Sequence, residues 1–310
     1  MLDSFNKKHL LGIKDLTKEE IAFIVYTAET LKEISSRDIK KVPTLRGKTI
    51  ISFFYEPSTR TRTSFEIAAK RLSADTIGIS ASSSSITKGE SLIDTARNIE
   101  AMQPDLLIIR YPYAGAPHFL AKHLDTPVVN AGDGMHEHPT QALLDVMTVK
   151  EKKGRIEGLE VTIIGDIAHS RVARSDILAF TKLGARVRVT GPPSLIPPYI
   201  EALGADYYPK TEDALTETDV VIALRVQSER QKQVFFPDIR EYFIHFGLNK
   251  RRLSLTKEDA LLMHPGPVNW GVELDPEIME LPRTIILDQV SNGVAIRMAI
   301  LYLLVSSRLI

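Results

Sequence analysis

The sequence of 310 residues contains no cysteine, and this absence excludes several classes of site. Without thiols the chain can form no disulfide, no thiolate zinc site and no cysteine nucleophile, and nothing argues for an oxidising compartment. Neither sign of charge is in excess, because Lys plus Arg and Asp plus Glu both number 39. We therefore expect no overall field that attracts nucleic acid or an anionic membrane, and any anion site must be local.

Long apolar runs and secretory features are also missing. Hydrophobic residues make up 44% of the chain, but no run approaches the roughly 18 uncharged apolar residues that a membrane span requires. The apolar stretch after Lys7 and Lys8 is interrupted at once by Lys14 and Asp15, which a secretory signal would not tolerate. These features predict a cytoplasmic protein that does not enter a membrane.

Strand-like and helix-like segments alternate along most of the chain. Thr17 and Glu20 have the spacing of a capping box, so a helix is expected to begin there. After it, β-rich runs are separated by helical patterns, some of which begin near Ser58, Ser91 and His138, and this order is typical of βα units. The expected strands are 49–55, 106–110, 128–130, 160–165, 186–190, 219–224 and 261–263.

These patterns predict an α/β fold with two Rossmann-like parallel-sheet domains linked by helices. The length is about twice the ~150 residues expected for one domain, and a charged, glycine-containing stretch at 150–158 is the natural junction. The predicted domains are therefore 1–150 and 151–288. The remaining segment, 289–310, has an apolar face that cannot stand alone, so we expect this helix to pack back on the first domain and complete it.

The most informative segment is a hydroxyl-rich turn between a predicted strand and a predicted helix. Its residues are Ser58, Thr59, Arg60, Thr61 and Arg62. Free backbone amides in a first helical turn, together with the helix dipole, form an anion site, and the hydroxyls and a guanidinium add donors suited to phosphate. The glycines and the Gly-Lys-Ser/Thr ending of an ATP-binding loop are absent.

The alternative for this turn is a helix cap flanked by surface arginines. Two arginines in a first turn weaken that interpretation. Positive charge at a helix N-terminus is unfavourable by about 0.3–1 kcal/mol per residue unless an anion offsets it. A bound anion resolves the conflict.

The sequence resembles the aspartate and ornithine carbamoyltransferases. The resemblance rests on five motifs in the same order along the chain. They are Ser58-Thr59-Arg60-Thr61-Arg62, Ser84 with Lys88-Gly89-Glu90, Arg110, His138-Pro139-Thr140-Gln141, and His264-Pro265-Gly266-Pro267.

Residues of the second domain favour the aspartate branch of this family. Arg171, Arg225 and Gln227 offer two guanidinium groups and an amide, which suit a substrate with two carboxylates. An ornithine enzyme should instead present a carboxylate, and the resemblance implies a Ser-Met-Gly segment and a His-Cys-Leu-Pro motif in that branch. Neither motif occurs here. The expected reaction is transfer of the carbamoyl group of carbamoyl phosphate to L-aspartate, in pyrimidine biosynthesis.

The resemblance also implies a role for each motif residue. Arg110, His138 and Thr61 would surround the carbonyl oxygen, and Gln141 would orient the carbamoyl NH₂ group. Lys88 would reach carbamoyl phosphate and aspartate from a neighbouring subunit, which implies a homotrimer with shared sites. A regulatory chain or a dihydroorotase is a candidate partner. The expected carbamoyl-phosphate ligands are Ser58, Thr59, Arg60, Thr61, Ser84, Lys88, Arg110, His138, Gln141, Pro265, Gly266 and Pro267.

We predict neither a metal nor a cofactor. His136 and His138 suggest a metal pair, but residues two apart do not share a helix face, and no third ligand stands nearby in sequence. A helix-capping role for His138 stays open beside the catalytic one. Gly165-Asp166 resembles the start of a dinucleotide-binding turn, yet Gly-x-Gly-x-x-Gly does not follow, so nicotinamide binding is not expected.

One position departs from the family pattern, and three hypotheses stay open. Trp270 stands where many relatives have arginine, which puts the local affinity in doubt rather than the reaction. The chain could be an active aspartate enzyme, a transcarbamoylase for ornithine or a related amine, or a non-catalytic homologue that only assembles with a partner. The clustered arginines argue against the last, because a scaffold has no need for them.

Overall fold

The computed structural model describes residues 5–80, 89–226 and 239–306. The chain divides into two compact units, one formed by Met1–Met147 with Val290–Ile310 and the other by Thr148–Gln289. Two helices, α5 (Pro139–Lys153) and α10 (Ile286–Ser306), run from one unit into the other.

The first unit is built on a four-stranded parallel sheet with the order β2-β1-β3-β4. The chain moves from β1 outward to β2 and then returns to the other side of β1 with β3, so the order reverses between β1 and β3. Ligands of open parallel sheets bind beyond the carboxyl ends of the strands at such a reversal. The strands are β1 (Thr49–Phe54), β2 (Asp75–Ser80), β3 (Leu106–Tyr111) and β4 (Val128–Asp133).

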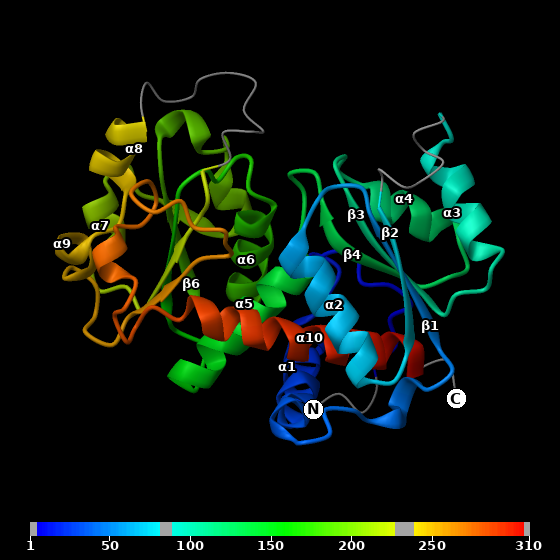
Figure 1. Ribbon diagram of the computed structural model, residues 1–310. Coiled ribbons are helices and arrows are strands. Elements are labelled where there is room, and N and C mark those ends of the chain that lie inside the picture. The colour runs from blue at the N-terminus through cyan, green and yellow to red at the C-terminus, as the bar shows by residue number, and fades with distance from the viewer. Residues whose placement is uncertain (1–4, 81–88, 227–238, 307–310) are drawn as a thin grey trace. The chain divides into compact units, whose positions relative to one another are not determined.

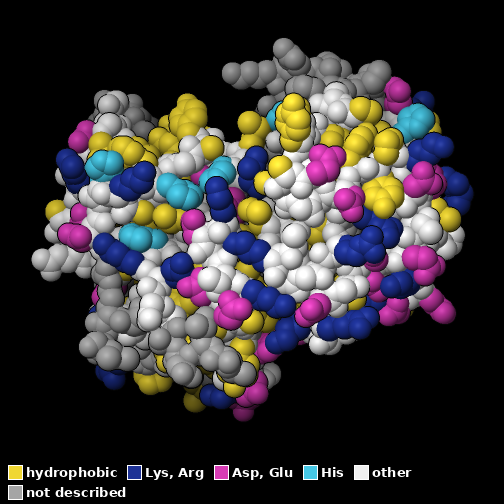
Figure 2. Space-filling view, turned by 180° about the vertical axis from the view of Figure 1, so that it is seen from behind, with side chains coloured by type: hydrophobic (Ala, Val, Ile, Leu, Met, Phe, Trp, Pro, Cys, Tyr) yellow, Lys and Arg dark blue, Asp and Glu magenta, His cyan; other side chains and the backbone are white. Residues whose placement is uncertain are grey.

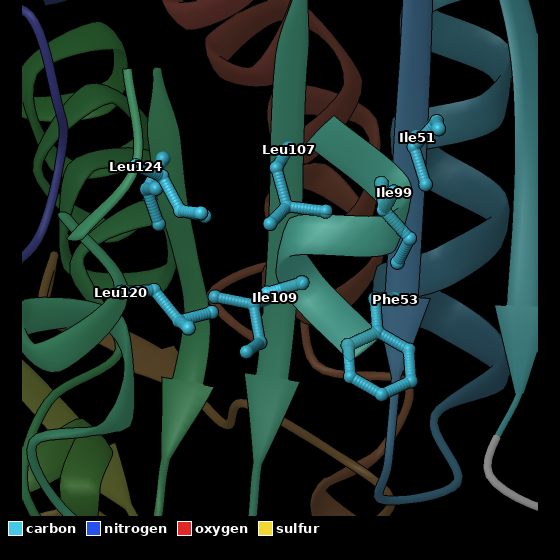
Figure 3. Packing of buried hydrophobic residues seen from close by; sticks show 9 residues of the cluster. Ile51, Phe53, Ile99, Leu107, Ile109, Leu120 and Leu124 are labelled. Carbon is cyan, nitrogen blue, oxygen red and sulfur yellow. The ribbon is translucent and has the colours of Figure 1, made fainter. Parts of the chain in front are cut away.

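Helices cover both faces of this sheet (Figure 1). On one face, Ile51 and Phe53 of β1 and Leu107 and Ile109 of β3 pack with residues of α3 and α4 (Figure 3). Successive side chains of a strand alternate between faces, so the opposite face of β1 presents Ile50, which lines a small cavity together with Phe65 and Ala69 of α2. The helices of the first unit before α5 are α1 (Lys18–Lys32), α2 (Thr59–Arg71), α3 (Leu92–Glu100) and α4 (Ala116–His123).

The second unit contains a five-stranded parallel sheet with the order β7-β6-β5-β8-β9. Its strand order reverses between β5 and β8, and its core includes Ile164, Val221 and Leu262 from three neighbouring strands. The strands are β5 (Glu160–Ile164), β6 (Arg186–Thr190), β7 (Ala205–Tyr207), β8 (Val220–Ala223) and β9 (Leu261–Met263), and the helices are α6 (Arg171–Lys182), α7 (Thr211–Leu215), α8 (Ile239–Phe246) and α9 (Lys250–Leu253).

Helix α10 is long and apolar enough to cross a membrane by length and composition, with a mean hydropathy of 1.3 in its most apolar window. In the structure 72% of that window is buried, as in the core helix of a globular domain. Its buried residues include Ile296, Ile300 and Leu304. The predicted α/β class, with two parallel-sheet domains and a C-terminal helix on the first, is confirmed.

The surface carries both signs of charge. Figure 2 shows basic and acidic side chains interspersed over the face in view. This agrees with the equal totals of acidic and basic residues in the sequence. Charge that selects an anion must therefore come from particular residues.

Candidate active site

The turn after β1 leads directly into helix α2, and its polar groups surround the start of that helix. Ser58 is the N-cap residue but makes no side-chain cap bond, and the first turn contains no acidic residue. Thr59 and Arg60 are exposed, whereas Thr61 is buried. The amides of a first turn have no partner inside the helix, so this end of α2 presents donors and a positive dipole to an anion.

The two arginines of this helix differ in their surroundings. The Arg62 Nε atom lies 2.9 Å from Oε1 of Glu66, one helical turn later, so its charge is compensated within α2. Arg60 lies at the second position of the helix and is exposed. The charge of Arg62 therefore does not by itself call for a bound anion.

Arg110 lies at the carboxyl end of β3, next to the turn after β1. The pairing of β1 with β3 sets Phe54 opposite Arg110, and the Tyr55 N–H donates to the Arg110 carbonyl. The Arg110 guanidinium donates to the Ala131 carbonyl at 3.2 Å, and its Nε lies 3.4 Å from a Glu56 carboxylate oxygen. These contacts hold the guanidinium at the strand-order reversal, beside the start of α2.

His138 and Gln141 come from the turn after β4 and the first turn of α5. His138 is buried, with 5% of its surface exposed, and its carbonyl accepts the Gln141 N–H at 2.9 Å. The Gln141 side-chain nitrogen donates to both carboxylate oxygens of Asp145, each at 3.2 Å. A carboxylate can only accept, so the amide oxygen of Gln141 is the atom that can receive hydrogens from a ligand NH₂ group.

Arg297 of α10 was not predicted from the sequence, although it lies close to this network. It donates to the Gly293 carbonyl at 3.0 Å and to the Thr140 hydroxyl at 3.4 Å, and its guanidinium stacks over the Phe65 ring at 5.1 Å. Burial lowers the pKa of Arg297 to about 10, while attraction to Asp145 acts in the opposite direction. A lone arginine in an apolar helix is the sequence signal that could have revealed this contact.

Asp145 fixes the orientation of the Gln141 side-chain amide, which the family resemblance predicts to orient the carbamoyl NH₂ group. We expect Asp145→Asn to lower kcat/KM for carbamoyl phosphate about tenfold, since a hydrogen bond to a charged group is worth roughly 1 kcal/mol more than a neutral one. The substitution also removes a negative charge that attracts the buried Arg297 guanidinium, so urea unfolding should report a lower stability than that of the parent. A double-mutant cycle separates the two effects. In a Gln141→Ala background, Asp145→Asn should no longer change kcat/KM, and an undiminished tenfold loss there would contradict the positioning role.

In the second unit, the two predicted arginines follow the two strands between which the strand order reverses. Arg171 is the first residue of α6, after β5, and is 3% exposed; the preceding Ser170 caps the helix by accepting the Ala173 N–H at 3.1 Å. Arg225 follows β8 by two residues. Because β5 pairs with β8, these two arginines leave neighbouring strands at the same edge of the sheet.

Glu273 joins the Arg225 segment to the turn after β9. It accepts the Val226 N–H at 2.7 Å through one oxygen and the Asn269 N–H at 2.7 Å through the other. Burial raises the pKa of this carboxyl, although these hydrogen bonds act in the opposite direction. Glu273 was not predicted, because its role comes from two segments that are distant in sequence.

The predicted Pro265-Gly266-Pro267 turn begins at a buried histidine. The Gly266 N–H donates to His264 Nδ1 at 2.8 Å, and the His264 N–H donates to the Gln289 side chain at 2.9 Å. Gly266 has φ 63°, a left-handed conformation that side chains disfavour, which explains glycine at this position. Trp270, the departure from the family pattern, is 38% exposed.

Three predicted site residues, Ser84, Lys88 and Gln227, lie outside the described residues. The others fall into two groups, one at the carboxyl ends of β1, β3 and β4 and one at the carboxyl ends of β5, β8 and β9. The sheets thus gather each group from separate parts of the chain.

Comparison with known proteins agrees with this arrangement. Residues 8–151 match the family model of the aspartate/ornithine carbamoyltransferase carbamoyl-P binding domain, and residues 157–304 match that of the Asp/Orn binding domain. The aspartate carbamoyltransferase catalytic subunit of Syntrophotalea carbinolica is 58% identical over 300 residues, which cover 97% of this chain and 96% of the relative. The corresponding subunit of Geobacter sulfurreducens is 58% identical over 299 residues, which cover 96% of each chain.

Solved structures show the same fold. The catalytic subunit of M. jannaschii aspartate transcarbamoylase has a TM-score of 0.85 at 34% identity, covering 97% of this chain and 99% of that one. Aspartate transcarbamoylase from Trypanosoma cruzi, solved in complex with carbamoyl phosphate and aspartate, has a TM-score of 0.85 at 27% identity, covering 95% of this chain and 94% of that one.

Ornithine carbamoyltransferase from Pyrococcus furiosus has a TM-score of 0.89 at 31% identity, covering 98% of this chain and 99% of that one. The fold is therefore common to both branches and does not by itself select the amine substrate. The matched domain models, the full-length relatives and the shared fold show that the chain belongs to the aspartate/ornithine carbamoyltransferase family.

Proposed function

We propose that this protein is an aspartate carbamoyltransferase, which converts carbamoyl phosphate and L-aspartate to N-carbamoyl-L-aspartate and phosphate in de novo pyrimidine biosynthesis. The observation that carries the proposal is the pair of arginines, Arg171 and Arg225, at the strand-order reversal of the second unit. Two guanidinium groups suit the two carboxylates of aspartate. The names of the full-length relatives support the same choice.

Each unit is proposed to supply most of the ligands of one substrate. The first, completed by α10, would hold carbamoyl phosphate, with its phosphate at the start of α2 on Ser58, Thr59, Arg60 and Thr61. The second would hold aspartate through Arg171 and Arg225, with Gln227 as an amide donor and the Pro265-Gly266-Pro267 turn contacting carbamoyl phosphate. Ser84 and Lys88 are proposed to come from a neighbouring subunit of a homotrimer, as the family resemblance implies.

The proposed reaction mechanism follows from the hydrogen-bond donors of the first unit. The uncharged aspartate amine attacks the carbonyl carbon, and the electrons of the C=O bond move to oxygen. Arg110, His138 and Thr61 would stabilise that oxyanion, an arrangement in which one lost donor typically costs about 10² to 10³ in rate. Collapse of the intermediate expels phosphate, whose departing oxygen accepts the amine proton, while the Gln141 amide oxygen orients the carbamoyl NH₂.

Orientation of two small substrates is a large part of the proposed catalysis. Effective molarities of well-oriented groups can reach about 10⁵ M or more. No metal or cofactor has a place in this mechanism. The same proposal places the protein in the cytoplasm, with a regulatory chain or a dihydroorotase as candidate partners.

A direct assay tests the substrate assignment. The purified protein is incubated with carbamoyl phosphate and either L-aspartate or L-ornithine, and carbamoylated product is measured. We expect product with aspartate and only a trace with ornithine. Equal or faster turnover of ornithine would assign the chain to the other branch, and no turnover of either amine would favour the non-catalytic hypothesis.

A further inference from the structure

A cluster of possible metal ligands lies in the first unit, among residues to which the proposed reaction gives no role. Its members are His118 in the first turn of α4, Asp133 at the end of β4, and His136 in the turn that follows. One potential ligand atom from each residue lies within 4.8 Å of the others. The cluster therefore joins two parts of the chain that the sequence pattern alone would not connect.

Asp133 is a preorganised carboxylate at the centre of this cluster. Its side chain is fully buried. One oxygen accepts from the Asn130 side chain at 2.8 Å and from the Glu137 N–H at 3.1 Å, and the other accepts from the Gly115 N–H at 2.7 Å. The carboxylate cannot rotate away without breaking these bonds, so a cation would meet a fixed oxygen.

His136 already lies at a distance suited to sharing a cation with Asp133. Its Nδ1 is 3.0 Å from Asp133 Oδ2. Two ligands at about 2.0–2.1 Å from a tetrahedral Zn²⁺ are roughly 3.3–3.4 Å apart. A small outward shift of the imidazole would therefore let a cation replace the shared proton.

His118 supplies the independent observation that points to a ligand. Its Nδ1 is buried and has no hydrogen-bond partner among the residues that the structure describes. Its Nε2 lies 3.6 Å from Asp15 Oδ2, and its ring meets the His136 ring edge-on at 5.5 Å between centroids. With the proton on Nε2 facing Asp15, the lone pair of Nδ1 is available, which is the carboxylate–histidine–metal arrangement common at metal sites.

Charge and donor type together select the class of cation. Asp133 as a ligand and Asp15 behind His118 supply two negative charges for a divalent ion. Two imidazoles and one carboxylate suit Zn²⁺ and its first-row neighbours, whereas Mg²⁺ and Ca²⁺ prefer oxygen ligands. A water molecule would complete a tetrahedral set.

We propose that His118, Asp133 and His136 form a binding site for a divalent cation of the zinc class, distinct from the proposed catalytic residues. Bound metal would tie the start of α4 to the turn that leads into His138. The sequence-based expectation of no metal considered His136 with His138, whereas the structure pairs His136 with His118, which is 18 positions earlier in the sequence. The proposal does not depend on the proposed function.

The test uses the full chain freed of metal with a chelator. Zn²⁺ is titrated by calorimetry, and Co²⁺ by its visible absorption, which reports coordination geometry. We expect one cation per chain and no comparable binding of Mg²⁺. Because a metal ligand or its immediate support typically contributes about 10- to 100-fold in affinity, His118→Ala and His136→Asn should each weaken binding at least tenfold.

A matched control lies on the same helix. His123, in the last turn of α4, is exposed and outside the cluster, so His123→Ala should bind Zn²⁺ as the parent does. In chelator, His118→Ala should match the parent in circular dichroism and carbamoyl transfer, which separates loss of the site from loss of fold or of the proposed function. Absence of Zn²⁺ binding by the parent, or equal affinity in the parent and His118→Ala, would overturn the proposal.

Discussion

Arg60→Ala should lower kcat/KM for carbamoyl phosphate by about 10² to 10⁴, the largest loss expected from any single change at the phosphate end of the site. Charge-assisted hydrogen bonds contribute about 1.5–3 kcal/mol each, and a guanidinium at this position can give two of them to phosphate. Each ~1.4 kcal/mol of lost transition-state stabilisation is tenfold in rate. Steady-state kinetics at saturating aspartate measures the effect.

Arg62 provides the matched control for this experiment. Arg62 belongs to the same helix, and its substitution by alanine removes the same charge. The Arg62 guanidinium, however, is paired with Glu66. Surface ion pairs of this kind contribute about 0.3–0.5 kcal/mol, so Arg62→Ala should keep near-normal activity. Equal losses in the two variants would indicate a general charge effect, and near-normal kcat/KM in Arg60→Ala would place the anion site elsewhere.

Arg225→Ala should raise the KM for aspartate by about 10² or more, because a bidentate guanidinium–carboxylate pair contributes two charge-assisted bonds. Binding of carbamoyl phosphate alone should change little, since the proposed phosphate donors belong to the other unit. Initial rates over a wide aspartate range, together with calorimetry of carbamoyl phosphate, measure both quantities.

A surface arginine of the same unit controls for charge. Arg186 is exposed and pairs with Glu160 at 3.2 Å, so Arg186→Ala should leave the aspartate KM unchanged. If Arg225→Ala left the aspartate KM within twofold of the parent, or weakened carbamoyl phosphate binding instead, the assignment of the aspartate carboxylates to this arginine would be wrong.

Much of the fold followed from local patterns that strongly favour one structure. Thr17 and Glu20 form both bonds of the predicted capping box at the start of α1, because each partner lies within one turn. Several inner strands were predicted because they are largely buried and appear as continuous apolar runs, such as Leu106 to Ile109 of β3.

Among the strands within residues 5–80, 89–226 and 239–306, β2 and β7 were not predicted, and both lie at the edges of their sheets. Residues of β2 are exposed or half-buried, and its sequence contains Gly78 and polar residues, so neither an apolar run nor a clear alternation marks it. Strand β7 has three residues, of which one, Ala205, is buried. These two edge strands are specified mainly by pairing with a neighbour, whereas the edge strands β4 and β9 are buried along their length and were predicted.

The residues of the proposed site also fall into those that were predicted from the sequence and those that were not. The motif residues were predicted from the family resemblance, and the structure places those that it describes after apolar strands, at the carboxyl edges of the two parallel sheets. Supporting residues could not, since Asp145, Glu273 and Arg297 act through neighbours brought to them by tertiary packing. The ring contact between His118 and His136 was not predicted for the same reason, because tertiary packing brings the two residues together.

The structure corrects one part of the interpretation of the first helical turn of α2. From the sequence, both arginines opposed the helix dipole and together argued for an anion. In the structure Glu66 compensates the charge of Arg62, so the proposed anion site depends on the Arg60 side chain and on the first-turn amides of α2. The anion site remains a proposal that rests on fewer charges than the sequence suggested.

A crystal of the protein soaked with carbamoyl phosphate tests that proposal most directly. Density for the phosphate should lie at the start of α2, within hydrogen-bond distance of the backbone amides of Thr59 to Thr61 and of the Arg60 guanidinium, with the carbonyl oxygen toward Arg110. Density elsewhere, with Arg60 extended into solvent, would contradict the account.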